Sequence, residues 1–250
     1  MKVHVSCLAD VVQRVVDLAA QTGGSTAGSY VCVSNVHMCM ETFDSVDFRN
    51  IVNQADLVVA DGKPISMVQK LLGHRQAKQV RGQDLMHALC QVAADNGLKI
   101  GLYGGSSITL LQSVISRLIG AYPNLQVSYA FAPPFRALTP NEDRDVIGQI
   151  HAAEVDLLFV GIGCPKQEIW MARHKGHLNC VMLGVGAAFD FIAGHKKHAP
   201  RWMQRMSLEW LFRLCREPKR LWKRYLQQNP RFLYHCAMQF GKAKTTRNKT

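Results

Sequence analysis

Short apolar segments alternate with longer stretches of helical character along most of this 250-residue chain. Such an alternation builds βα units, so it predicts an α/β fold with a mostly parallel sheet flanked by helices. Thr139 and Glu142 form a capping box at the start of one of these helices. We expect strands at Tyr30–Ser34, Leu57–Ala60, Lys99–Tyr103, Gln126–Ala130, Asp156–Val160 and Cys180–Val185, and helices at Met40–Gln54, Ile65–Leu72, Gln83–Asn96, Ser107–Ala121 and Asn141–Ala153.

The composition is that of a globular protein, with 48% hydrophobic and 19% charged residues, which excludes a disordered or collagen-like chain. The longest apolar stretches, Val155–Cys164 and Cys180–Gly194, are too short or too interrupted to span a bilayer. Asp10 and Arg14 interrupt the first apolar stretch, which therefore lacks the uninterrupted core of a signal peptide. We expect a cytoplasmic protein.

The net charge of +12 is concentrated at the C-terminal end. Residues 195–250 hold fifteen Lys and Arg against Glu209 and Glu217, a net charge of +13, whereas residues 1–194 have a net charge of −1. We therefore divide the chain into a core, 1–194, and a basic appendage, 195–250. This asymmetry indicates a polyanionic partner, either an anionic lipid surface or a nucleic acid.

Eight scattered cysteines form no CxxC pair and are expected to be free, buried thiols. His174 with His177, and His195 with His198, have a spacing seen in metal sites, but no Cys or carboxylate set accompanies them. The sequence therefore predicts neither a metal site nor a cofactor.

Ligands of a parallel sheet bind beyond the carboxyl ends of its strands, so the loops that follow the strands are the candidate sites. Gly104-Gly105-Ser106 opens a helix with Ser106 as the expected N-cap. Its backbone N–H groups suit a phosphate, although the glycines can equally serve only a tight turn. The glycine pattern at Gly161 and Gly163 is incomplete as a dinucleotide fingerprint, and Gly62-Lys63 is incomplete as a P-loop, so neither class is favoured.

Asp61 directly follows an apolar strand and is the main candidate for a general base. Partial burial there would raise the pKa of its carboxylate toward the useful range. The alternative role is to cap the helix that begins near Pro64. Asp190, in an apolar loop, is a second candidate. Asp143-Arg144-Asp145 resembles a metal-binding DxD motif, but it lies within a predicted helix, where the two aspartates point to different sides, so we discount it.

The appendage has two stripes at helical spacing, an apolar one and a basic one, offset by roughly 200°. Tryptophan and basic residues on one amphipathic helix are typical of an interfacial membrane segment. The alternative is a C-terminal helix that packs its apolar stripe on the core, and the two roles can share the appendage. The apolar stripe contains Leu221, Trp222, Tyr225 and Leu226, and the basic stripe contains Lys219, Arg220, Lys223 and Arg224.

The segment from Ala132 to Leu226 resembles the WecG/TagA/CpsF family of bacterial glycosyltransferases. The resemblance rests on APPFRALTPNE, GIGCPKQEIWMARH, GVGAAFDFIAG and APRWMQRMSLEWLFRLCREPKRLWKRYL, preceded in order by Asn35-Val36-His37, ADGKP at 60–64 and RGQDL at 81–85. It covers roughly residues 30–226, and we recognise no part of it in residues 1–29 or 227–250.

The resemblance implies a Rossmann-like core and an inverting transfer of a hexose or N-acetylhexosamine-type sugar. The donor is a UDP-sugar, and the acceptor is a polyprenyl-diphosphate-linked saccharide at the inner face of the cell membrane, in cell-surface or exopolysaccharide assembly. It also implies that the appendage is linked to membrane association. His37 stands where several members have proline or glutamate, which leaves the donor sugar open.

The resemblance implies that Asp61 is the base and that Asn35, Arg81 and Gln167 lie in the pocket. Arg213, Arg220 and Arg224 are the candidates that would meet the lipid diphosphate. Together with the loop analysis, the expected substrate-binding residues are Asn35, Arg81, Gly104, Gly105, Ser106, Lys166, Gln167 and Asp190, and the expected lipid-diphosphate or membrane residues are Arg213, Lys219, Arg220, Trp222, Lys223 and Arg224.

Two other classes compete with this assignment. A basic nucleic-acid-binding module would use the +13 appendage, but no helix-turn-helix, zinc finger or RRM signature accompanies it, so we expect no nucleic-acid partner. A non-catalytic membrane scaffold would keep the appendage, but the intact Asp61 and PKQE loops argue against it. The sequence leaves the acceptor saccharide and homo-oligomerisation open.

Overall fold

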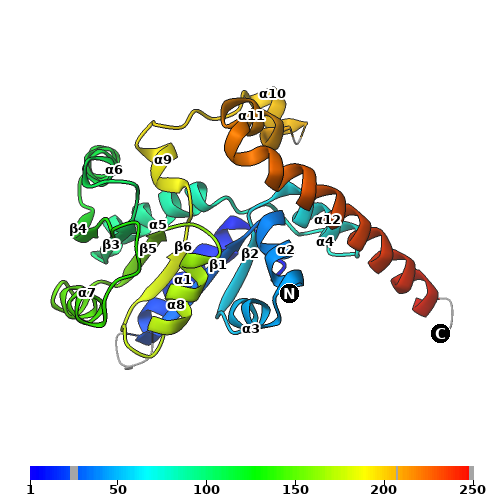
Figure 1. Ribbon diagram of the computed structural model, residues 1–250. Coiled ribbons are helices and arrows are strands. Elements are labelled where there is room, and N and C mark those ends of the chain that lie inside the picture. Colours follow the sequence, from blue (N-terminus) through cyan, green and yellow to red (C-terminus); the bar gives the residue numbers. More distant parts are fainter. Residues whose placement is uncertain (23–27, 207, 248–250) are drawn as a thin grey trace.

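A computed structural model describes residues 1–22, 28–206 and 208–247, without the side chains of residues 201, 205, 224 and 241–247. Its centre is a six-stranded, all-parallel sheet with the order β2-β1-β6-β5-β3-β4 (Figure 1). The α/β fold is therefore confirmed, and each predicted strand is correct to within one residue at either end. The strands are β1 Ser29–Ser34, β2 Leu57–Ala60, β3 Lys99–Gly104, β4 Gln126–Phe131, β5 Leu157–Gly161 and β6 Val181–Gly184.

Helices cover both faces of this sheet. Along β5, Leu157 and Phe159 point into one apolar cluster while Leu158 and Val160 point into another, as the two-residue period of a strand requires. The first face is covered by α1 Leu8–Thr22, α5 Gly82–Asn96, α6 Ile108–Ala121 and α9 Ala188–Ile192, and the second by α3 Val46–Asn53, α7 Pro140–Ala152 and α8 Lys166–His174. Polar side chains are thereby left to the ends of the strands.

The single helix expected at Met40–Gln54 is two helices, α2 Val36–Asp44 and α3. Ser45 separates them because its backbone N–H bonds back to Glu41 at the end of α2, while its hydroxyl accepts from the Phe48 N–H at the start of α3. The prediction was wrong because Ser45 has an extended backbone that the apolar periodicity does not reveal. The capping box of α7 is present as predicted.

Three helices were missed in the sequence. In α1 the apolar residues Val11, Val15 and Leu18 are buried at helical spacing. The other two, α8 and α9, are short and begin within the loops that follow β5 and β6. All eight cysteines are free, but only Cys32, Cys90 and Cys180 are buried, so the expectation of buried thiols holds for part of the set.

The C-terminal residues form α10 Arg201–Arg205, α11 Glu209–Arg216 and the long α12 Pro218–Arg247. Figure 1 shows α10 and α11 beyond the carboxyl ends of the strands, on the same side of the sheet as α9, with α12 running past α2 and α4 (Lys63–Leu71). Phe232 of α12 packs against Met40 of α2 and Ile65 of α4. Among the described helices, none is both long enough and apolar enough to cross a bilayer.

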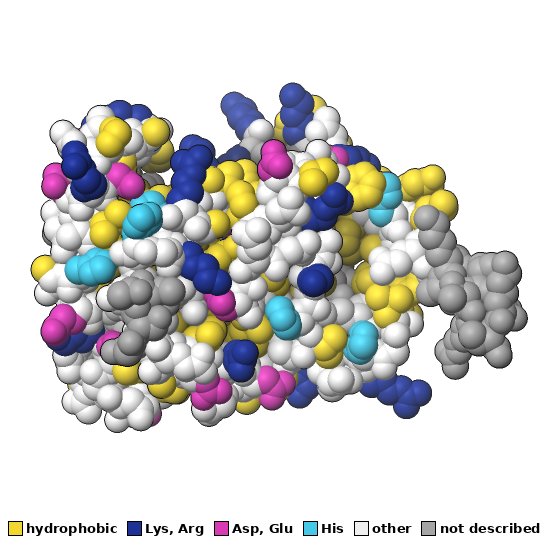
Figure 2. Space-filling view, turned by 90° about the horizontal axis from the view of Figure 1, so that it is seen from below, with side chains coloured by type: hydrophobic (Ala, Val, Ile, Leu, Met, Phe, Trp, Pro, Cys, Tyr) yellow, Lys and Arg dark blue, Asp and Glu magenta, His cyan; other side chains and the backbone are white. Residues whose placement is uncertain are grey.

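Figure 2 views the molecule from the amino ends of the strands. Acidic and basic side chains are interspersed on this face, without a continuous area of either sign. This mixture agrees with the net charge of −1 over residues 1–194. The excess positive charge belongs to residues 195–250, whose net charge is +13.

The carboxyl ends of β3 and β5 approach so closely that a side chain cannot fit between them. A Cβ atom on Gly104 would lie 2.6 Å from the backbone of Gly161, and Gly104 has a φ of +134°. Gly148, in α7, has open space around it. These two glycines therefore give a matched test.

We expect Gly104→Ala to destabilise the fold by about 2–4 kcal/mol, because it adds both backbone strain and overpacking. Gly148→Ala should stabilise it by about 0.5–1 kcal/mol through helix propensity. Urea unfolding of both variants measures the two effects. Equal stability of the two variants would contradict the close approach of β3 and β5.

Candidate active site

Asp61 lies immediately beyond β2, at the carboxyl edge of the sheet. Its N–H donates to the Ser34 carbonyl at 2.7 Å, which fixes the start of the loop. Burial raises the pKa of its carboxyl group to about 6, and the positive charge of Arg213 and a hydrogen bond from the Gly82 backbone moderate the increase. The alternative capping role is wrong, because Gly62 is the N-cap of α4 and no side chain caps that helix.

The appendage forms part of the surroundings of Asp61. Arg81 makes a close ion pair with Glu209, the first residue of α11. Glu209 raises the pKa of Asp61, whereas Arg81 lowers it, so both charges lie near the carboxylate. The Lys63 ammonium also donates to the Gln204 carbonyl in α10. The appendage therefore covers the loop that carries Asp61.

Asn35 lies beside the Asp61 loop. It is the N-cap of α2, with its side-chain oxygen 3.3 Å from the Met38 N–H, and a Cβ atom on Gly62 would touch it at 3.8 Å. His37 has its Nδ1 atom 2.8 Å from Oε1 of Gln228 in α12. In this chain the residue at position 37 therefore contacts the appendage.

Gln167 and Glu168 form a buried pair in the first turn of α8. Gln167 is 3% exposed and Glu168 is 0% exposed, whereas Lys166 before them is exposed. The Gln167 amide donates from Nε2 to Oε1 of Glu168 at 2.6 Å. Burial raises the pKa of Glu168 to about 7. Gln167 also lies against the end of β6, where a Cβ atom on Gly184 would be 2.8 Å from its Nε2.

The Gly104-Gly105-Ser106 turn differs from its prediction. Ser107 caps α6, so the expectation for Ser106 was wrong, and Ser106 itself is exposed. Gly105 has a φ of +82° and donates its N–H to the Gly161 carbonyl at 3.2 Å. These contacts favour the tight-turn reading of the two glycines over a phosphate cradle.

Asp190 lies in α9 and faces the start of the appendage. Its Oδ2 atom accepts from the Lys196 ammonium at 3.2 Å, and the same ammonium is 3.5 Å from Glu217. Arg213 has its guanidinium 5.0 Å from the ring centroid of Phe191, the next residue of α9. The connection between core and appendage is thus held by charge pairs on the Asp190 loop.

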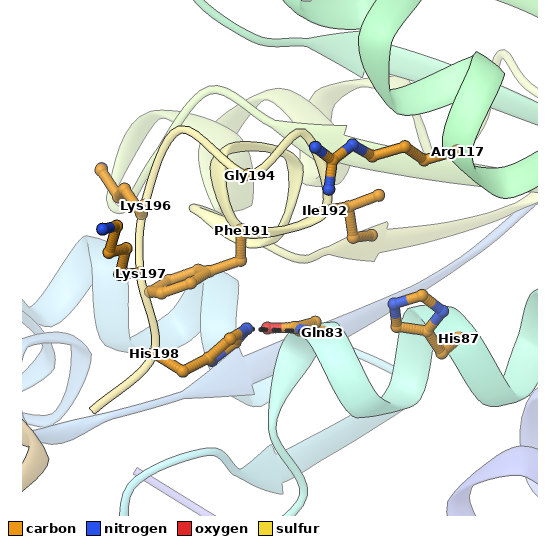
Figure 3. Close-up of a pocket in the computed structure, with 9 residues that line it drawn as sticks. All are labelled: Gln83, His87, Arg117, Phe191, Ile192, Gly194, Lys196, Lys197 and His198. Atoms are coloured by element: carbon orange, nitrogen blue, oxygen red, sulfur yellow. Dashed lines mark hydrogen bonds between the residues drawn. The ribbon is translucent and has the colours of Figure 1, made fainter. Parts of the chain in front are cut away.

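A cavity of about 540 Å³ opens beside this connection. Figure 3 shows Arg117 of α6 and His87 of α5 directed toward it, with Phe191 and Ile192 of α9 along its wall. Asp61 does not line the cavity. The first turn of α5 lies between them, because Gly82 gives a backbone hydrogen bond to Asp61 and Gln83 lines the cavity. The lining residues are Gln83, His87, Arg117, Phe191, Ile192, Gly194, Lys196, Lys197 and His198, and none of these described residues carries a carboxylate.

The appendage residues named from the sequence separate into two groups. Arg213 influences Asp61, whereas Lys219, Arg220, Trp222 and Lys223 are exposed on α12, and Arg220 pairs with Glu217. The side chain of Arg224 lies outside the described residues. The structure thus brings Asn35, Arg81 and Arg213 to the Asp61 loop. Gln167 lies at the end of β6, and Asp190 lies in α9, the helix that follows β6.

Sequence reasoning missed two acidic residues at this edge, Glu168 and Glu209. Glu168 follows Gln167 in the PKQE segment, and an acidic residue next to the buried strand β5 and its glycine loop was the available signal. Glu209 offered no signal of its own, because its partner Arg81 is 128 residues away in the chain.

The Asp143 carboxylate, half of the DxD-like triplet, is 3.2 Å from the His174 ring and lies in α7 as expected. Within the described residues, no group of three or more His, Cys, Asp or Glu side chains is arranged to hold a metal ion.

A desolvated carboxylate near arginines, at the carboxyl edge of a parallel sheet, is typical of an enzyme that acts on a phosphorylated substrate. The chain belongs to the Glycosyl transferase WecG/TagA/CpsF family, whose sequence model matches residues 1–246. The match includes residues 1–29 and 227–246, where sequence inspection recognised no part of the resemblance.

Several curated relatives carry the name N-acetylglucosaminyldiphosphoundecaprenol N-acetyl-beta-D-mannosaminyltransferase. The protein of Bacillus subtilis strain 168 is 29% identical over 202 residues, covering 80% of this chain and 75% of the relative. That of Staphylococcus aureus strain MW2 is 29% identical over 221 residues, covering 88% and 84%. The protein is thus a glycosyltransferase, and the predicted family and enzyme class are confirmed.

The raised pKa of Asp61 has a consequence for stability. The ordinary pKa is 3.8 and the folded value is about 6, so the folded protein binds more protons between these values. Stability therefore falls as the pH rises through this interval. Asp145→Asn, at an exposed position of α7, is a matched control.

We expect Asp61→Asn to be more stable than the wild type at pH 8, by on the order of 1–2 kcal/mol. The difference should disappear below about pH 4, where the aspartate is protonated in both states. Urea unfolding at several pH values measures it. An Asp61→Asn protein that is less stable than the wild type at pH 8 would show that the carboxylate is not desolvated.

Proposed function

We propose that this protein is an inverting glycosyltransferase that moves a sugar from a UDP-sugar to a polyprenyl-diphosphate-linked saccharide. The observation that carries the proposal is the desolvated Asp61 carboxylate beside Arg81 and Arg213. The names of the relatives support an acceptor with N-acetylglucosamine on undecaprenyl diphosphate, and they favour an N-acetylhexosamine over a plain hexose. UDP-N-acetylmannosamine is therefore the first donor to test.

In the proposed reaction Asp61 takes the proton of the acceptor hydroxyl while the hydroxyl oxygen attacks the anomeric carbon. The bond from that carbon to the UDP oxygen breaks on the opposite face, so UDP leaves with the electron pair and the configuration inverts. A single base suffices for this displacement. A pKa of about 6 leaves Asp61 ionised at neutral pH but still basic enough to accept the proton.

Positive charge near Asp61 suits the phosphate groups of the two substrates. We assign Arg81 and Arg213 to the diphosphates, because cations held in place stabilise the negative charge that develops on the departing UDP. In this account no metal is required. Arg81 is paired with Glu209 in the structure, so its phosphate contact would replace or extend that ion pair.

The appendage is proposed to hold the enzyme at the inner face of the cell membrane. On α12, Leu221 and Phe232 are buried against the rest of the protein, whereas Trp222 and Leu226 are 49% and 65% exposed. The apolar stripe is thus shared between packing on the core and exposure to the surroundings. Exposed tryptophan beside lysines suits the headgroup region of an anionic leaflet.

The first experiment measures transfer from UDP-N-acetylmannosamine to N-acetylglucosaminyl diphosphoundecaprenol by the full chain. We expect Asp61→Asn to lower kcat by roughly 10²–10⁴-fold with little change in donor KM, because it removes a positioned base. Asp145→Asn is again the control. Near-normal turnover by a folded Asp61→Asn protein would remove Asp61 from the role and promote Asp190.

A second experiment tests the membrane contact by flotation with liposomes that contain phosphatidylglycerol. Lys219→Gln with Lys223→Gln should weaken binding about 30-fold at low salt, since each lysine contributes about 1 kcal/mol, and the loss should shrink at high salt. Trp222→Ala should weaken binding at every salt concentration. Lys2→Gln with Lys78→Gln, two exposed core lysines, is the charge-matched control. Equal losses in the two double variants would refute a specific role for α12.

A further inference from the structure

The most unusual feature outside the Asp61 loop is the buried carboxylate of Glu168. It is 0% exposed, in the first turn of α8, where that helix packs against β1, β5 and β6. A buried carboxylate without a cationic partner is costly, so it calls for a role. Among the described residues, the side chains that favour its ionisation are the Gln167 amide and the Cys164 thiol.

The contact between the two side chains fixes the direction of the Gln167 amide. An ionised carboxylate can only accept hydrogen bonds, so it must face the amide nitrogen. Nε2 of Gln167 accordingly donates to Glu168 at 2.6 Å. The amide oxygen then lies on the other side, 3.9 Å from where a Cβ atom on Gly186 would be. Gln167 therefore presents an acceptor at the end of β6.

Two acceptor atoms at this place lack partners. Among the described residues, neither Oε1 of Gln167 nor Oε2 of Glu168 has a hydrogen-bond partner, although both atoms are buried. Buried acceptors are normally satisfied, and leaving them unpaired is unfavourable. An acceptor atom repels phosphate, so the ligand group that matches the Gln167 oxygen is a hydrogen-bond donor, an O–H or N–H.

We propose that Glu168 is a positioning residue, which holds the Gln167 carbonyl oxygen in place to accept a hydrogen bond from an O–H or acetamido N–H of the transferred sugar. This inference rests on the proposed function and deepens it. Gln167 would bind the sugar through a hydrogen bond, while the arginines near Asp61 bind the phosphate groups. Glu168 itself would not touch the substrate.

Ionisation of Glu168 is needed for this role. Burial raises its pKa to about 7, and a protonated Glu168 can donate to the Gln167 oxygen, which removes the fixed polarity of the amide. The titratable groups on the strands around it are the Cys32 thiol and the Tyr30 hydroxyl of β1, and the Cys164 thiol lies in the loop before α8. The strands β5 and β6 contribute none. On α3, Asp47 lines a separate groove with Arg173 of α8.

The test uses Glu168→Gln, which keeps the shape of the side chain and removes its charge. With UDP-N-acetylmannosamine we expect donor KM to rise about tenfold with a smaller change in kcat, since one oriented hydrogen bond is lost. The rise in wild-type donor KM on acidification through about pH 7 should be absent from the variant. The dissociation constant of UDP alone, measured by calorimetry, should not change.

A double-mutant cycle separates positioning from a direct contact. Gln167→Met should raise donor KM to a similar extent, and the double variant should be no worse than Gln167→Met alone, because Glu168 acts through Gln167. Additive losses, or an unchanged donor KM in Glu168→Gln, would overturn the proposal. Asp145→Asn controls for the loss of a negative charge elsewhere.

Stability supplies an independent readout. Because burial disfavours the ionised form, Glu168→Gln should melt at a higher temperature than the wild type at pH 8. A purely structural carboxylate predicts a lower melting temperature, which would count against the proposal. If Glu168→Gln does not fold, the same pH dependence of donor KM is sought in Gln167→Met, where its persistence would overturn the proposal. A wild type that transfers no sugar from any UDP-sugar would instead contradict the proposed function.

Discussion

A parallel sheet that is covered on both faces leaves polar side chains one place to gather, the ends of its strands. In this protein the interior of every central strand is apolar and buried, so the first polar residue beyond β2, Asp61, lies where the apolar packing stops. The same constraint brings the loops after β1, β5 and β6 to one edge. The position and the desolvation of the candidate base both follow from it.

The appendage packs against this edge of the sheet. Glu209, Gln204 and Lys196 each contact a residue of the core at or near the candidate site, and the rest of the chain continues along α2 as α12. Arg213 lies near enough to Asp61 to lower its pKa. The appendage is thus a wall of the site on one side, and on the other it exposes lysines and tryptophan. This arrangement suits the proposed acceptor, a saccharide carried on a polyprenyl diphosphate.

Two carboxylates in this region, Asp61 and Glu168, have raised pKa values for the same reason, burial, and in both cases ionisation at neutral pH opposes folding. Their surroundings differ. Asp61 is near two arginines and a backbone N–H, which limit the rise of its pKa to about 6. Glu168 has an amide and a thiol, and its pKa is higher. Asp61 is therefore mostly ionised at neutral pH, whereas Glu168 changes its protonation state near pH 7.

The sequence by itself determined the strands, the capping box of α7 and the place of Asp61, because each depends on residues close together in the chain. Apolar segments of strand length, Thr139 with Glu142, and a carboxylate after β2 are all local patterns. Only the tertiary structure decided which distant residues meet: Glu209 with Arg81, His37 with Gln228, and Gly104 with Gly161. Their partners come from elements that the fold alone brings together, so no local pattern records them. The break at Ser45 and the cap at Ser107 were decided by backbone geometry at single residues, which periodicity over a whole helix cannot specify.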